Sequence, residues 1–167
     1  MSLLKSEWRK LVYVRAHWGL LIGAVVLAGF GTAVTPIILD SNSATFGLAL
    51  DQQTAVDSVY ANAISSYIFA IIIGIMLMSG EFRHGTAVAT FLTAPKRGTV
   101  LANKLGIAAI GGALVMVIST AAGIAAGWVT LSFFENVAEP SSGVFVNTML
   151  AAVVSGSILG IVGVAIG

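Results

Sequence analysis

Four long stretches without a charged residue constrain the fold of this chain more than any other feature. Each is near or above the roughly 20 residues that a helix needs to cross a bilayer core of about 30 Å. The stretches are Trp18–Leu39, Val59–Gly80, Leu105–Phe134 and Val144–Gly167. The sequence therefore predicts an all-α integral membrane protein with four transmembrane helices.

Two other interpretations of these stretches fit less well. Transmembrane strands would alternate apolar and polar residues over about ten positions, whereas Ile68–Met78 is apolar throughout. The first stretch exceeds the 7–15 apolar residues of a secretory signal, so we expect it to be retained as a span. The third stretch is the longest, and we expect its span to be 105–131, with the aromatic end at the membrane interface.

The charges are divided between two sets of connections. All eight Lys and Arg residues lie in 1–17 or 81–104. The connections 40–58 and 135–143 carry five acidic residues and no basic ones. Basic connections stay in the cytoplasm, which predicts a cytoplasmic amino terminus for a protein of the cytoplasmic (plasma) membrane.

Residues 1–17 have the periodicity of an interfacial helix. Leu4, Trp8 and Leu11 recur on one side, and basic residues lie toward the other. This pattern is typical of a helix lying on the membrane surface, and it predicts an amphipathic elbow before the transmembrane domain at 18–167. The alternative is a basic tail that serves only for orientation.

The charged segment 81–104 predicts a short helix between two spans. Thr86 can cap a helix from Ala87 to Thr93, Pro95 then enforces a turn, and Thr99 can cap the helix of the third span. Such a helix would lie parallel to the membrane and carry exposed apolar side chains, which suits docking of a cytoplasmic partner.

Small and polar residues within the spans predict a packed bundle. Four glycine pairs have the spacing that lets helices approach closely in lipid. They are Gly19 with Gly23, Gly123 with Gly127, Gly156 with Gly160, and Gly163 with Gly167. Ser, Thr and Asn residues in the spans are expected to bond their own preceding turn or a neighbouring helix.

Three stretches together resemble permease subunits of type-2 ATP-binding-cassette transporters. The charged segment contains EFRHGT followed by FLTAPKRGTVLANKL, and the amino terminus contains SEWRKLVYVR. The resemblance implies an export permease coupled to a separate ATP-binding-cassette ATPase, which binds ATP and Mg. It also implies a second permease copy or related subunit and contact with membrane lipid, but no nucleic acid.

The resemblance also assigns residues and a length. The implied ATPase-coupling loop comprises Glu81, Arg83, Gly85, Thr86, Phe91, Leu92, Pro95 and Arg97, and the implied elbow comprises Glu7, Trp8 and Arg9. Such permeases usually have six spans, so we expect this chain to be the front part of a longer one. A genuine four-span protein is the alternative.

No motif predicts catalysis by the chain itself. It lacks the G-x-x-x-x-G-K-[ST] phosphate loop, so we expect no ATP hydrolysis without a partner. Glu81 and His84 have a metal-like spacing but too few companion ligands, so neither a metal nor a cofactor is expected here. The competing function is a non-transporting immunity or assembly factor whose basic loop binds another cytoplasmic partner.

Overall fold

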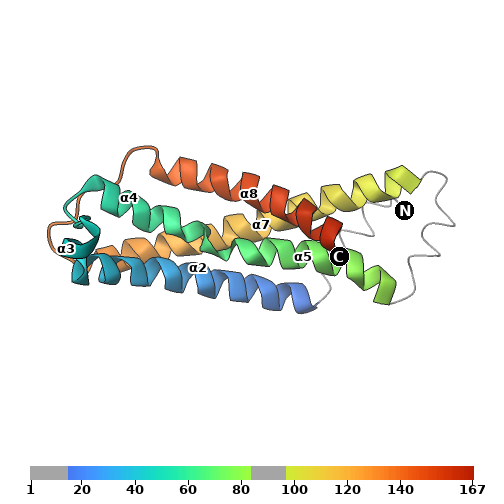
Figure 1. Cartoon of the computed structure of the whole chain (residues 1–167), viewed down its shortest axis with the longest axis horizontal. Helices are drawn as coiled ribbons and strands as arrows, with labels where there is room; N and C mark the ends of the chain where they lie inside the picture. Colours follow the sequence, from blue (N-terminus) through green and yellow to red (C-terminus); the bar gives the residue numbers. More distant parts are fainter. Residues whose placement is uncertain (1–14, 84–96) are drawn as a thin grey trace.

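The computed structural model describes residues 15–83 and 97–167, and every regular element in these ranges is a helix (Figure 1). Four antiparallel passes run along the molecule, and each is long and apolar enough to cross a membrane. They are α2 (Arg15–Ser41); α4 (Gln53–Ala61), the 3₁₀ helix η1 (Asn62–Ser66) and α5 (Tyr67–Arg83); α7 (Arg97–Leu131); and α8 (Val144–Ile166). Within the described residues, the predictions of an all-helical fold and of four passes long and apolar enough to cross a membrane are confirmed.

The charges lie at opposite ends of this bundle. Arg15 begins α2, Arg83 ends α5 and Arg97 begins α7, all at the end that we call the basic end. The other end, where α2 ends and α8 begins, holds both acidic connections, and we call it the acidic end. The antiparallel order thus separates the charges as the sequence predicts.

Two hydrogen bonds join the connections at the acidic end. The connection between α2 and α4, which includes α3 (Ser43–Phe46), accepts a bond at Leu50 O from the Ala138 amide at 2.9 Å. The Ser141 amide donates to Asp57 Oδ1 of α4, also at 2.9 Å. The connection between α7 and α8 is therefore hydrogen-bonded both to the loop before the second pass and to α4, the first helix of that pass.

α8 packs through glycine, with almost no side chain between its backbone and its neighbours. A Cβ on Gly156 would lie 2.6 Å from the carbonyl oxygen of Gly112 in α7, and one on Gly163 would lie 2.8 Å from Gly74 Cα in α5. Real Cβ atoms essentially never come within 3.0 Å of such atoms. Close backbone approach is how helices associate where lipid supplies no hydrophobic drive. We call this side of α8 its glycine face.

The predicted glycine pairs fared differently. Both pairs in α8 and the pair in α7 face packed atoms, and Gly23 faces the ring of Phe69. Gly19, in contrast, has no described atom within 4 Å of where its Cβ would be. Gly74 and Gly112, which supply the other half of the α8 contact, belong to none of the predicted pairs.

The helix boundaries differ from the predicted ones in two places. Pro36 lies inside α2, which continues past the predicted end of the first span at Leu39 to Ser41. The third span was expected from 105, but α7 begins at Arg97, so Thr99 lies within this helix and does not cap it. The connection between α5 and α7 therefore consists of residues 84–96, shorter than the predicted loop 81–104.

Candidate functional site

Three residues of the predicted coupling loop lie at the ends of two helices, and the other five lie outside the described ranges. Glu81 and Arg83 belong to the last turn of α5, and Arg97 is the first residue of α7. The remaining predicted site residues lie outside the described ranges: Gly85, Thr86, Phe91, Leu92 and Pro95 of the loop, and Glu7, Trp8 and Arg9 of the elbow.

Lys104 joins α5 to α7 near the basic end. The sequence places it in the loop, but it lies inside α7 and only 2% of its surface is exposed. Its Nζ donates a hydrogen bond to Leu77 O of α5 at 3.3 Å. Lys104 lies near the start of the candidate span Leu101–Leu131, one residue before the predicted start of the third span at 105. A buried ammonium in a span is costly unless it is bonded, so this contact holds the two helices together.

The second pass is broken near its middle by η1. A 3₁₀ turn replaces the usual i−4 bonds by tighter ones and often marks a hinge. Two neighbouring helices bond to this segment: Thr120 Oγ1 of α7 donates to Ala63 O at 3.4 Å, and Asn62 Nδ2 donates to Gly31 O of α2 at 3.2 Å. Both helices thus satisfy polar groups of the irregular turn, of which Ala63 and Ser66 are buried.

A buried pair of hydroxyl groups lies beside the break. Ser66 Oγ at the end of η1 and Ser119 Oγ of α7 are 2.6 Å apart. Either hydroxyl can be the donor, since Ser119 Oγ also lies 3.2 Å from Met116 O and Ser66 Oγ lies 3.8 Å from Met116 Sδ. Ser65 Oγ is also buried and has no partner among the described residues. Leaving such a group unpaired costs about 1–3 kcal/mol, so the break combines a fixed contact to α7 with a local instability.

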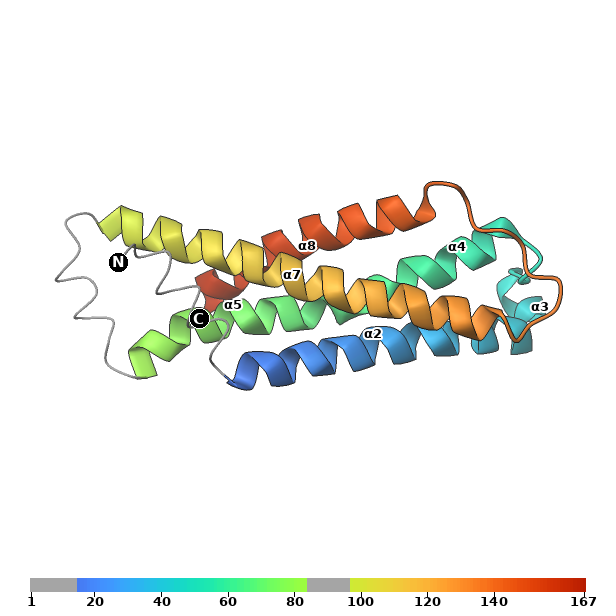
Figure 2. The same cartoon turned by 180° about the vertical axis from the view of Figure 1, so that it is seen from behind.

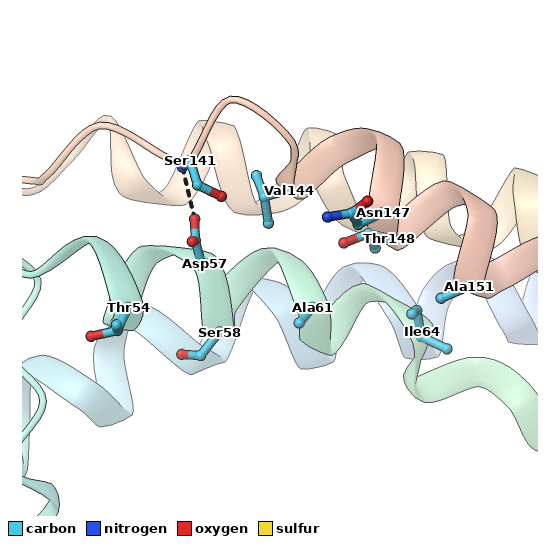
Figure 3. A pocket seen from close by; sticks show the side chains of 10 residues that line it. All are labelled: Thr54, Asp57, Ser58, Ala61, Ile64, Ser141, Val144, Asn147, Thr148 and Ala151. Atoms are coloured by element: carbon cyan, nitrogen blue, oxygen red, sulfur yellow. Dashed lines mark hydrogen bonds between the residues drawn. The ribbon is translucent and has the colours of Figure 1, made fainter.

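A groove opens between α4 and the first turns of α8, on the acidic side of the break (Figure 3). It has a volume of about 490 Å³. Asp57, Ser58 and Ser141 line it toward the acidic end, whereas Asn147, Thr148, Ile64 and Ala151 line it toward the middle of the bundle. The only carboxylate of the lining therefore lies at one end, and the other end combines apolar side chains with two uncharged polar ones.

Comparisons with protein-family models, with curated proteins and with solved structures gave no match. The resemblance to transporter permeases thus rests on the three stretches of sequence alone. Function has to be argued from the residues and from the geometry of the bundle.

The break and the groove were not predicted. Asn62, Ser65 and Ser66 lie within five positions of each other in an otherwise apolar stretch, and this clustering was the available signal for the break. The groove had no comparable signal, because its two walls come from helices separated by the whole of α5 and α7.

Proposed function

We propose that this chain is the membrane-spanning permease subunit of an ATP-binding-cassette exporter, with a separate ATPase docked on residues 84–96 and the adjoining helix ends. The observation that carries the proposal is the hydrogen bond from Lys104 Nζ of α7 to Leu77 O of α5. It joins the two helices that residues 84–96 connect. A partner that displaces the segment displaces both helices together. The sequence resemblance supplies the identity of the partner.

The lengths of the two helices suit such docking. α7 has 35 residues, or about 52 Å at 1.5 Å per residue, against a bilayer core of about 30 Å. At the basic end, α5 and α7 both extend beyond the start of α2 and the end of α8 (Figure 2). A water-soluble ATPase would meet these two helices before the other two.

The 3₁₀ break η1 provides a point about which α5 can move when the docking segment is displaced. α5 has 17 residues between the docking segment and η1, which is about 25 Å. The unpaired Ser65 hydroxyl lowers the cost of rearranging the turn at which α5 meets α4. We therefore propose that ATP binding in the partner swings α5 about η1 and so alters the path between two permease subunits.

The first test is co-purification of the membrane protein in mild detergent, followed by mass spectrometry and an assay of ATP hydrolysis. We expect a stoichiometric ATP-binding-cassette ATPase that is lost in Phe91→Glu. The matched control is Phe133→Glu, which changes a ring that is 81% exposed at the acidic end; this variant should keep the ATPase.

Two results would contradict the proposal. One is retention of the ATPase in Phe91→Glu, which would place docking elsewhere. The other is a preparation that keeps its oligomeric state but contains no ATPase. That second result would favour the non-transporting membrane protein, with residues 84–96 binding a different partner.

A further inference from the structure

We infer that the groove between α4 and α8 binds an amphiphile whose headgroup is an ammonium and whose tail is apolar. The inference goes beyond the proposed function, because binding here requires neither an ATPase nor transport. It rests on the position of the groove in the membrane, on its charge and on its lining.

The groove crosses the boundary between the membrane interface and the hydrocarbon core. The candidate span Gln53–Gly80 has 28 residues, more than the roughly 20 that cross the core; with Gly80 taken as the inner boundary, the outer boundary falls near Ala61. Asp57 lies one helical turn beyond this boundary, in the interfacial layer. Ile64 and Ala151 line the part of the groove that lies on the core side.

The charge at the acidic end selects a cationic headgroup. Five acidic residues lie at this end, three in the connections and two in the adjoining turns of α2 and α4, and no Lys or Arg lies in 40–58 or 135–143. The α8 amino terminus contributes roughly half a positive charge, which the carboxylate of Asp57 more than offsets. An ammonium is therefore attracted to the end of the groove that holds Asp57, and a phosphate or carboxylate without its own cation is repelled.

The lining provides acceptors for such a headgroup. Oδ1 of Asp57 already accepts a hydrogen bond from the Ser141 amide. Asp57 lines the groove, and its other carboxylate oxygen is left to accept a bond from a headgroup. Ser58 donates its proton to Ala55 O at 2.6 Å, so its hydroxyl oxygen has lone pairs left to accept. An ammonium carries up to three donors, and the groove, about 490 Å³ in volume and open on one side, has room for a headgroup and part of a tail.

Asp57 also has a structural role, because it accepts a hydrogen bond from Ser141, which lies just before α8 begins. Asp57→Asn separates the two roles. The amide oxygen of asparagine can still accept the bond from Ser141, but the negative charge is gone. Asp51→Asn is the matched control, since Asp51 is an exposed acid at the same end that does not line the groove.

The experiment measures binding of dodecylamine and of dodecanoate, which have the same tail length and opposite charge at neutral pH, to the purified protein in phosphatidylcholine nanodiscs. Equilibrium dialysis against empty nanodiscs removes the contribution of partition into lipid. We expect saturable binding of dodecylamine only, weakened about tenfold in Asp57→Asn and unchanged in Asp51→Asn. Equal binding of both probes, or equal weakening in both variants, would overturn the inference.

A second pair of variants tests the tail without touching charge. Ala151→Phe fills the apolar part of the groove and should abolish saturable binding, whereas Ala125→Phe, at an exposed position of α7 away from the groove, should not. Unchanged binding in Ala151→Phe would overturn the inference. Replacing the lipid by phosphatidylethanolamine identifies the natural source of the ammonium: competition points to a resident lipid, and its absence points to a free amine.

Discussion

The glycine face of α8 leads to a specific prediction about stability. Alanine at Gly156 would bring its Cβ to 2.6 Å from Gly112 O and 2.8 Å from Met116 Cγ. An ordinary contact begins at 3.4 Å, so α7 and α8 would have to separate locally by 0.8 Å at the closer contact. Because the opposing atom is backbone, the strain cannot be relieved by turning a side chain.

A matched substitution in α7 isolates the cost of this overlap. Gly106 has no described atom within 4 Å of where its Cβ would be, so Gly106→Ala keeps only the gain in helix propensity, about 0.5–1 kcal/mol. Gly156→Ala has the same gain but adds an overpacking cost of about 1–3 kcal/mol. The difference between the two variants should therefore be about 1–3 kcal/mol, with Gly156→Ala the less stable.

Thermal unfolding in dodecylmaltoside, followed by circular dichroism, measures this difference. For a chain of this size, each kcal/mol corresponds to about 2–4 °C, so the two midpoints should differ by several degrees. Equal midpoints would show that α7 and α8 do not meet backbone to backbone, and would refute the packing described here.

Three further predictions use the same preparation. Ser119→Ala should lower stability by about 0.6–1.7 kcal/mol, and the double variant with Ser66→Ala should cost less than the sum of the singles in thermal unfolding; additive losses would show that the hydroxyls do not interact. Lys104→Glu places a buried carboxylate against a carbonyl oxygen and should lower the free energy of unfolding by about 3–5 kcal/mol. This loss should remove the folded peak in size-exclusion chromatography, whereas Lys104→Met should retain that peak. Because the chain has no cysteine, Ser43→Cys should react with an impermeant maleimide on intact cells and Thr86→Cys only after permeabilisation; the reverse pattern would overturn the predicted orientation.

The spans and the separation of charge could be predicted because both depend on local properties of the sequence. An uncharged run of sufficient length forms a helix in lipid whatever surrounds it. Antiparallel passes then bring alternate connections to the same end. These two facts sufficed for the order and number of the passes.

Features that depend on a partner helix could not be predicted in the same way. From the sequence, Lys104 is expected in a loop, because its partner, Leu77 O of α5, which accepts a hydrogen bond from it, is known only from the structure. Gly74 and Gly112 have no glycine four residues away, and only the approach of α8 explains them. The groove likewise needs two helices that are distant in sequence.

The two hydrogen bonds at the acidic end have a mechanical consequence. They couple the connection before α8 to the loop before α4 and to α4 itself, so a tilt of the long helices is resisted at that end. α7 is a lever of about 52 Å anchored there, so each degree of tilt about that anchor carries its far end about 0.9 Å. Gly112, which meets α8 backbone to backbone, lies about halfway along this lever, so any displacement of the far end is accompanied by about half that displacement at the glycine contact, which therefore resists the tilt.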